Sequence, residues 1–309
     1  MILFAAGIRR PDLAFPGQRT MPVDLSVELR RLWLSHTIYS VKQLSQAKQD
    51  TMTKDSPVAA GDTPWLLVSV RDVKEAEAAL AGGCDILDVK EPKNGPLGMV
   101  SMPNIGKIVT AVRKKSKTMP ISVAVGELSD WENLKKIPKL PAGVTYVKVG
   151  TAKIGKDANW PDHWKLVRKQ FETNAKAKFL WVAVAYADWR AAGAPSPTAI
   201  VDAVLEESLS KTGGCVGVLF DTWAKQGRSL WEWISRADLK RHADALHQGG
   251  RLVALAGGLG CDKLNDLHSL EPDIVGIRSA ACKDGTRNGI VSKEAVNAFR
   301  TCLKSAKKT

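Results

Sequence analysis

The stretch WLLVSVRDVKEAEAALAGGCDILDVK, residues 65–90, shows the pattern that most of this chain repeats. A short apolar run is followed by a segment with helical periodicity, in which Asp72 and Glu75 have the spacing of a capping box and Gly82 marks the end. A second apolar run then begins at once. Nearly continuous runs of valine, isoleucine and leucine are typical of strands that are buried on both faces of a parallel sheet.

Eight such runs occur in the chain, and helical segments separate them. The predicted strands are 65–70, 84–90, 121–126, 146–150, 179–186, 215–222, 252–258 and 273–278. The predicted helices lie near 72–82, 105–112, 131–137, 160–173, 198–210, 229–248, 263–270 and 292–306. Eight strand–helix units in about 245 residues predict an α/β fold, a (β/α)8 TIM barrel of the aldolase type. An open doubly wound sheet usually has G-x-G-x-x-G after its first strand, whereas the turn here is SVRD.

The first 62 residues differ from the rest. Pro11, Pro16 and Pro22 interrupt the stretch, and a polar run leads up to residue 62 without any long periodic element. We therefore expect residues 1–62 to be an N-terminal extension without ordered structure, or to include sequence upstream of a natural start at Met52. Residues 63–309 are expected to form the catalytic barrel domain.

Composition limits the classes of function. Apolar residues make up 44% and charged residues 25%, as in ordinary globular proteins, and no run is long and apolar enough to span a membrane. The formal charge of +13 favours anionic partners, but the basic residues are spread along the chain. We therefore expect a small phosphorylated substrate rather than nucleic acid or a membrane. We also expect a homo-oligomer.

The cysteines predict a cytoplasmic protein. There are five, they are far apart, and none belongs to a C-x-x-C pair; they are Cys84, Cys215, Cys261, Cys282 and Cys302. An odd number without a pattern indicates reduced, buried thiols.

Charged residues stand at the ends of several predicted strands. Active sites of (β/α)8 barrels lie at the carboxyl ends of the strands. Asp88 and Lys90 are two residues apart in the second strand, so their side chains share a face. Lys148 lies among valines in the fourth strand, and Asp221, followed by Lys225, ends the sixth. Structural ion pairing at the barrel mouth is the alternative, but three strand ends with the same chemistry favour a catalytic cluster.

Clustered lysines suggest imine chemistry. A lysine in apolar surroundings or beside another cation has a lowered pKa, and its free amine can attack a carbonyl to form a Schiff base. One of Lys90 and Lys148 would be the nucleophile and the other a proton carrier. Asp88 and Asp221 would orient the ammonium groups and move protons.

No metal or organic cofactor is expected. The five histidines fall in predicted helices or in the extension, and no run of residues has the spacing of a metal site or a nucleotide fingerprint.

The last two strands predict a phosphate site. Gly257 and Gly258 follow the seventh strand, and Arg278 and Ser279 end the eighth. Many barrels bind phosphate through backbone N–H groups of these two loops. We expect Arg278 to add a positive charge there.

Several of the strands and strand ends described above resemble those of a known family, the (5-formylfuran-3-yl)methyl phosphate synthases of methanofuran biosynthesis. A specific string among them is DVKEPKNGPLG at 88–98. The resemblance is carried by residues 66–69, 81–98, 146–150, 220–225 and 273–282. Trp223 and Gln226 depart from the family pattern near the sixth strand.

The resemblance implies a lyase that condenses two glyceraldehyde 3-phosphate molecules to the furan phosphate, with loss of phosphate and water. It implies that Lys90 forms the Schiff base and that Lys148 accepts a proton. Asp88, Asp221 and Lys225 match further active-site positions, and Lys93 is expected to contact substrate. Two alternatives remain: another class I aldolase acting on a sugar phosphate, and a non-catalytic barrel that binds a phosphorylated metabolite.

Overall fold

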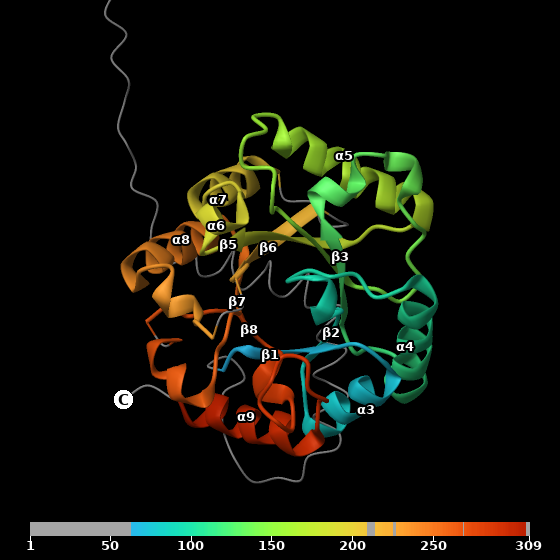
Figure 1. Ribbon diagram of the computed structural model, residues 1–309, viewed down its shortest axis with the longest axis vertical. Coiled ribbons are helices and arrows are strands. Elements are labelled where there is room, and N and C mark those ends of the chain that lie inside the picture. Colours follow the sequence, from blue (N-terminus) through green and yellow to red (C-terminus); the bar gives the residue numbers. More distant parts are fainter. Residues whose placement is uncertain (1–62, 209–213, 225–226, 268, 307–309) are drawn as a thin grey trace, which may run out of the picture.

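The computed structural model describes residues 63–208, 214–224, 227–267 and 269–306. The expectations for residues 1–62, including a start at Met52, lie outside these ranges. Eight parallel strands close into a barrel in chain order (Figure 1). They are β1 (Trp65–Val70), β2 (Ile86–Val89), β3 (Ile121–Glu127), β4 (Tyr146–Gly150), β5 (Leu180–Tyr186), β6 (Gly214–Asp221), β7 (Leu252–Leu255) and β8 (Ile274–Ile277). The predicted (β/α)8 barrel is confirmed.

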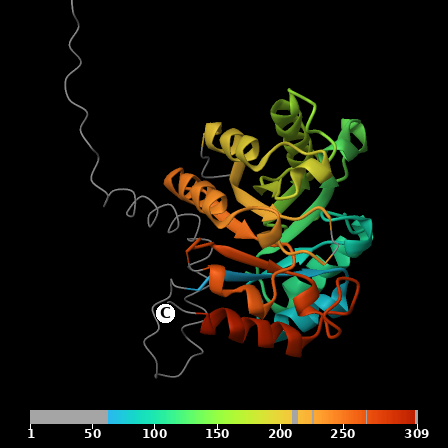
Figure 2. The ribbon, with the colours of Figure 1, turned by 60° about the vertical axis from the view of Figure 1, so that its left-hand side comes forward.

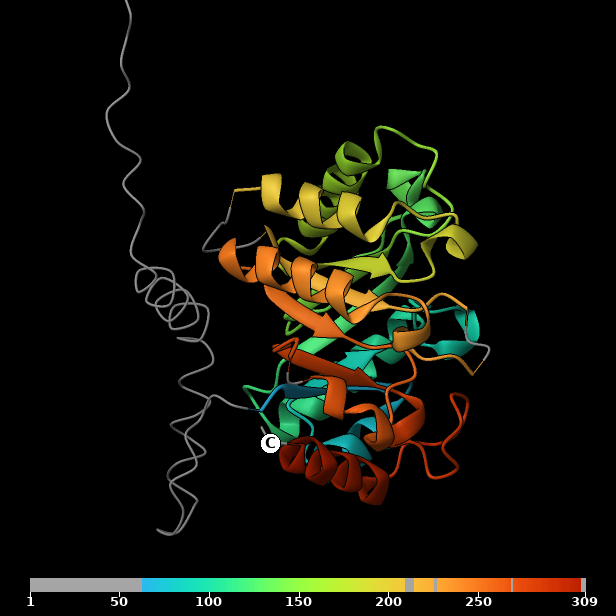
Figure 3. The same cartoon turned by 90° about the vertical axis from the view of Figure 1, so that its left-hand side faces the viewer.

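Helices surround the barrel on its outside (Figure 1). The α-helices are α3 (Val73–Gly82), α4 (Met102–Lys115), α5 (Trp160–Ala175), α6 (Trp189–Ala192), α7 (Pro197–Glu206), α8 (Arg236–Gln248) and α9 (Lys293–Ser305). The strands point in one direction, so the loops at their carboxyl ends gather on one side (Figures 2 and 3). Within the described ranges, no helix combines the length and apolar character that a membrane span requires.

Three predicted helices differ from the structure. The segment 131–137 forms two 3₁₀ turns, η2 (Leu128–Trp131) and η3 (Leu134–Lys136), in place of a helix. The segment 263–270 likewise contains only η5 (Cys261–Lys263) and η6 (Asn265–Leu267). The helix predicted over 229–248 begins later, at Arg236, after a short turn. Short segments can bury their leucines without a full helix, because tertiary packing supplies most helical stability.

The pleat of each strand divides its side chains between two cores. In β2, Leu87 and Val89 belong to the layer between strands and helices, and Ile86 belongs to the cluster inside the barrel. Successive side chains of a strand point to opposite faces, so Asp88 faces the interior with Ile86. The predicted pairing of Asp88 and Lys90 on one face is thereby confirmed, since both line the interior cavity.

The first and last units of the barrel are joined at the start of α3. The side chain of Asp72 accepts a hydrogen bond from the Glu75 N–H (2.9 Å), as a helix N-cap does. Glu75 does not return this bond to Asp72; its carboxylate accepts from the backbone N–H of Arg71 (2.9 Å) and from the guanidinium of Arg278. In Figure 1, α3 and α9 lie side by side below β1.

The prediction that all the cysteines are reduced is wrong. Cys261, in the loop after β7, forms a disulfide with Cys302 of α9, and their Cα atoms are 5.7 Å apart. The two residues are 41 positions apart in the chain, so no short motif indicated the pair. Cys84, Cys215 and Cys282 are buried, as expected, and lie outside this disulfide.

Candidate active site

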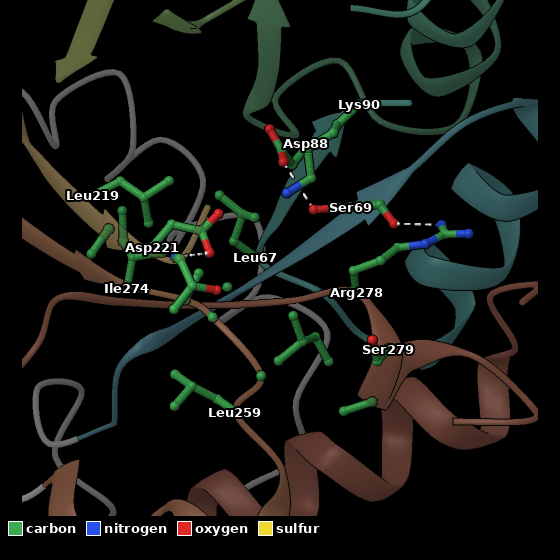
Figure 4. Close-up of a pocket in the computed structure, with 18 of the residues that line it drawn as sticks. Leu67, Ser69, Asp88, Lys90, Leu219, Asp221, Leu259, Ile274, Arg278 and Ser279 are labelled. Carbon is green, nitrogen blue, oxygen red and sulfur yellow. Dashed lines mark hydrogen bonds between the residues drawn. The ribbon is translucent and has the colours of Figure 1, made fainter. Parts of the chain in front are cut away.

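A cavity of about 480 Å³ opens at the carboxyl ends of the strands. Most of the predicted site residues line it: Asp88, Lys90, Lys148, Asp221, Gly257, Gly258, Arg278 and Ser279 (Figure 4). Lys93 is exposed and is not among the lining residues, so its predicted contact with substrate has no support from this geometry. Lys225 lies outside the described residues.

Asp88 is at the centre of a buried charge cluster. Its Oδ1 lies 2.6 Å from the Nζ atom of Lys148, and its Oδ2 accepts a hydrogen bond from the hydroxyl of Ser69 (2.9 Å). Asp88 is fully buried, and Lys148 and Lys90 are 3% and 8% exposed. Three strands supply these groups: β1 Ser69, β2 Asp88 and β4 Lys148. Figure 4 shows Asp88 and Lys90 together on the side of the cavity away from Asp221.

The cluster favours an ionised Asp88. Burial alone raises the pKa of a carboxyl group, but the ammonium groups of Lys148 and Lys90 outweigh it, and the pKa of Asp88 is held below its usual value. One carboxylate therefore faces two cationic side chains in a nearly dry environment. Removing a buried charge from water is costly unless partners compensate for it, and here all the partners lie at the mouth of a cavity.

Asp221 and Asp188 organise the loop that follows β6. Asp221 lines the cavity, and its Oδ1 accepts from the backbone N–H of Thr222 (2.7 Å). Asp188 is buried below the loop, and its carboxylate accepts from the N–H groups of Trp223 (2.7 Å) and Ala224 (2.6 Å). Asp188 therefore positions the segment that leads to Lys225.

The loops after β7 and β8 line the cavity with two glycines and the start of a short turn. Gly257 and Gly258 have φ values of +98° and +65°, which a residue with a side chain rarely adopts. A Cβ atom on Gly257 would also lie 2.9 Å from the side chain of Thr222. Ser279 and Ala280 begin the 3₁₀ turn η7 (Ser279–Ala281), where N–H groups have no partner within the turn.

Arg278 does not have the role that the sequence predicted. Its Nε donates to the Arg287 carbonyl, and its two terminal nitrogens donate to both oxygens of Glu75 and to the carbonyls of Ser69 and Gly289. These bonds use all five N–H donors of a guanidinium, so none is left for a phosphate. Figure 4 shows Arg278 extending away from Asp221 toward α3. Although Arg278 lines the cavity, it is a structural residue in this arrangement.

Sequence reasoning missed a buried carboxyl group at the end of β3. Glu127 accepts hydrogen bonds from the hydroxyl of Tyr186 (2.7 Å) and from the N–H of Ala152 (2.9 Å). Burial raises the pKa of Glu127 more than these hydrogen bonds lower it, and burial together with Glu127 raises the pKa of Tyr186 well above its usual value. The predicted strand ended at Gly126, one residue early. The rule that selected Asp221, a carboxylate at a strand end, would have found Glu127.

Ser122 is a second residue that the sequence did not suggest. It lies in β3 beside Asp88 of β2, it is buried, and it lines the cavity. Its hydroxyl has no hydrogen-bond partner among the described residues. A buried hydroxyl that faces a cavity is suited to bind a substrate oxygen.

Replacement of Gly150 is expected to disturb Glu127. A Cβ atom at this position would lie 2.0 Å from Glu127 Oε2, so Gly150→Ala must displace the carboxyl group. We expect a loss of about 1–3 kcal/mol in the free energy of unfolding, as for other overpacked sites. Thermal or urea unfolding measures this loss.

The double variant provides the control. With Glu127→Ala in the background, Gly150→Ala should cost less than about 1 kcal/mol, because the group that it would contact is absent. If Gly150→Ala lowers the free energy of unfolding equally with and without Glu127→Ala, contact with Glu127 is not the reason for the glycine at position 150.

In the part of the chain that the structure describes, no group of three or more histidine, cysteine or carboxylate side chains is placed to hold a metal ion. The charged groups that line the cavity are instead three lysines, three arginines and three aspartates.

The closed barrel, with lysines and carboxylates at its strand ends, defines the chain as a (β/α)8-barrel enzyme. The model of the 4-HFC-P synthase family matches residues 66–300. The (5-formylfuran-3-yl)methyl phosphate synthase of Methanocaldococcus jannaschii is 32% identical over 244 residues, which cover 77% of this chain and 99% of that protein. The synthase of Methanothermobacter thermautotrophicus is 31% identical over 245 residues, covering 78% and 99%. The chain belongs to the 4-HFC-P synthase family.

Solved structures with a similar fold include the phosphoribosyl anthranilate isomerase of Thermus thermophilus, with a TM-score of 0.46 and 14% identity over 79% of this chain and 100% of that one. The thiamine phosphate pyrophosphorylase of Pyrococcus furiosus has a TM-score of 0.45 and 13% identity, covering 79% and 96%.

Proposed function

We propose that this chain condenses two molecules of glyceraldehyde 3-phosphate to (5-formylfuran-3-yl)methyl phosphate, as a step in the biosynthesis of a methanofuran-type cofactor. The observation that carries the proposal is the cluster of Lys90, Lys148 and Asp88 at the mouth of the cavity. The names of the relatives support the product, and the cluster supports the chemistry. Two lysines beside one carboxylate can supply both a nucleophilic amine and a separate proton carrier.

In the proposed mechanism, the amine of Lys90 attacks the aldehyde carbon of the first substrate, and water leaves as the imine forms. The imine withdraws electrons, so a proton on the neighbouring carbon becomes acidic, and Lys148 accepts it. Asp88 stabilises the ammonium group of Lys148 at 2.6 Å. The resulting enamine expels the phosphate from the next carbon, as one C–O bond breaks, and this leaves an enol whose terminal carbon is nucleophilic. The second substrate isomerises to its ketone by proton transfer, and the terminal carbon attacks the ketone carbon to form the C–C bond.

The remaining steps close and dehydrate the ring. The free hydroxyl of the second substrate attacks the carbon next to the imine and closes the ring, and two hydroxyl groups leave as water. Hydrolysis of the imine then releases Lys90 and the formyl group. In total, two triose phosphates give the furan phosphate, one phosphate and two waters, which balances all atoms. Asp221 and Lys225 serve these proton transfers in the proposal, and the Ser122 hydroxyl binds a substrate oxygen.

The loops after β7 and β8 bind one substrate phosphate in this proposal. Gly258, Ser279 and Ala280 line the cavity, and their backbone N–H groups would bind the phosphate, as such groups bind anions in other concavities. Arg228 and Lys263 also line the cavity and add positive charge.

Incubation of the pure protein with glyceraldehyde 3-phosphate is expected to produce a furan aldehyde, followed by its ultraviolet absorption and identified by mass spectrometry. Dialysis against a chelator should leave the rate unchanged, because the proposed steps use only side chains and backbone groups. A different product would favour another aldolase, and a protein that binds the substrate without turnover would favour a non-catalytic barrel. Loss of activity on chelation, with recovery on adding a divalent ion, would mean that Asp88 and Asp221 are metal ligands.

A further inference from the structure

If the proposed function is correct, the cavity must accept phosphate groups from two substrate molecules. The loops after β7 and β8 account for one of them. The substrate that is bound to Lys90 carries its phosphate two carbons from the imine carbon, so this phosphate lies within reach of the loop that follows β2. Arg278, the cation that the sequence suggested, has no donor left. Another residue must supply the charge.

The loop over residues 283–291 is fixed by two arginines, Arg71 after β1 and Arg278 after β8. Arg71 donates to the carbonyls of Asn288 (3.2 Å) and Gly289 (3.0 Å). Arg278 donates to the carbonyls of Gly289 (2.6 Å) and Arg287 (2.9 Å). Four hydrogen bonds to three consecutive carbonyls set the position of this backbone, and so the direction in which the side chain of Arg287 leaves it.

Glu75 completes this support. Its carboxylate is paired with Arg278 (2.6 Å) and with Arg71 (2.6 Å), and it is 1% exposed. Burial raises the pKa of Glu75, but the hydrogen bonds from Arg278 and Arg71 outweigh it, and the pKa is lowered. The two arginines are therefore held by an ionised carboxylate and present their remaining donors to the loop.

Arg287 extends from this loop across the mouth of the cavity to the segment after β2. Its Nη2 donates to the carbonyls of Gly95 (2.8 Å) and Pro92 (3.3 Å), two to five residues beyond Lys90. Arg287 lines the cavity and is partly buried. Within the described residues, its Nε and Nη1 have no hydrogen-bond acceptor and its guanidinium has no ion pair. The Nε and Nη1 edge of a guanidinium matches two oxygens of a phosphate.

The electrostatic surroundings favour an anion at this edge. Burial lowers the pKa of Arg287, Asp221 opposes this effect, and Arg278 adds to it. A guanidinium that is partly removed from water without a paired carboxylate is unfavourable, and a bound dianion would compensate for that cost.

We propose that Arg287 binds the phosphate group of the triose phosphate that forms the imine with Lys90, and that Arg278, Arg71 and Glu75 position Arg287 for this contact. Arg287 thus determines substrate specificity, because it distinguishes a phosphorylated aldehyde from a neutral one. Arg278 acts only through Arg287.

The experiment compares imine formation with two aldehydes. Glyceraldehyde 3-phosphate and unphosphorylated glyceraldehyde are each titrated into the protein, the adduct on Lys90 is trapped with borohydride, and the trapped fraction is measured by intact mass. For Arg287→Ala, we expect the half-saturating concentration of the phosphorylated aldehyde to rise about 10- to 100-fold, the range for a lost charge-assisted contact. The value for glyceraldehyde should stay unchanged. Arg287→Lys should recover part of the loss.

Two further variants separate positioning from binding. Arg278→Lys removes the forked contacts to the loop, and it should reduce the preference for the phosphorylated aldehyde without altering the titration with glyceraldehyde. If Arg278 had a merely structural role, the half-saturating concentrations of both aldehydes would rise equally. Arg241→Ala, on the exposed face of α8, removes one positive charge that does not line the cavity and should change neither titration.

An Arg287→Ala protein with an unchanged preference for the phosphorylated aldehyde would overturn the inference. If the unmodified protein forms no adduct with either aldehyde, the proposed function fails, and a calorimetric titration with inorganic phosphate then decides the role of Arg287. Weaker phosphate binding by Arg287→Ala, relative to Arg241→Ala, would still support Arg287 as a phosphate ligand. Equal binding by the two variants would refute it.

Discussion

Lys90→Arg should abolish furan formation while substrate binding falls only modestly. A guanidinium keeps the positive charge beside Asp88, but it stays protonated and cannot form an imine. The variant retains the hydrogen-bonding groups of the cavity, so it should still bind the phosphate groups of the substrate. We expect the turnover number to fall below detection, a decrease of at least about 10³-fold for the loss of a covalent nucleophile.

Steady-state kinetics with glyceraldehyde 3-phosphate, combined with borohydride trapping, measures both parts of this prediction. Lys74→Arg, an exposed lysine on α3, is the matched control and should behave as the unmodified protein. Near-normal turnover by Lys90→Arg, or an adduct that maps to a different lysine, would refute the assignment of the Schiff base to Lys90.

Asp88→Asn is expected to lower both stability and activity. The substitution keeps the shape of the side chain but leaves the buried ammonium groups of Lys148 and Lys90 without their carboxylate. Removal of one partner from a buried ion pair costs about 3–5 kcal/mol. Turnover should fall as well, because Lys148 would lose the group that stabilises its protonated form.

The stability loss should depend on pH in a defined direction. Because the pKa of Asp88 is lower in the folded protein than in the unfolded chain, its contribution is complete above the unfolded pKa of about 4. The contribution is lost as the pH falls below that value and through the folded pKa. The difference in unfolding free energy between the two proteins should therefore be largest at neutral pH and shrink in acid. Urea unfolding at several pH values measures it.

Asp266→Asn is the control for this experiment. Asp266 pairs with Arg236 on the surface, where both side chains are 43% exposed. Such pairs contribute at most about 1 kcal/mol, so the variant should be nearly as stable as the unmodified protein at every pH. An Asp88→Asn protein with full stability at neutral pH would show that Lys148 and Lys90 do not require the carboxylate.

The sequence was sufficient for the barrel and for the centre of the site because both depend on local rules. Runs of β-branched residues buried on both faces gave all eight strands, and the two-residue period placed Asp88 and Lys90 on one face. The same two-residue period placed Lys148 inside the barrel, because Val147 and Val149 on either side of it face the helices.

The failures involve partners that are distant in the chain. Arg278 looked like a phosphate ligand because its contacts with Glu75, 203 positions away, could not be inferred from spacing. The pairing of Cys261 with Cys302 depends in the same way on how α9 packs beneath the loop after β7. Glu127 was missed for a different reason: glycine at position 126 suggested a strand end, whereas β3 continues through it with φ of +82°.

The contact between Glu75 and Arg278 also has a consequence for biosynthesis. Glu75 belongs to the first strand–helix unit of the barrel, and Arg278 follows the last strand. As a ribosome makes the chain from its N-terminus, Glu75 emerges long before its partner does. In an incomplete barrel that ends before β8, the carboxylate of Glu75 has no Arg278 to neutralise it. Such a barrel also lacks Arg287. If Arg287 selects phosphorylated substrates as proposed, this selectivity arises only when the barrel closes.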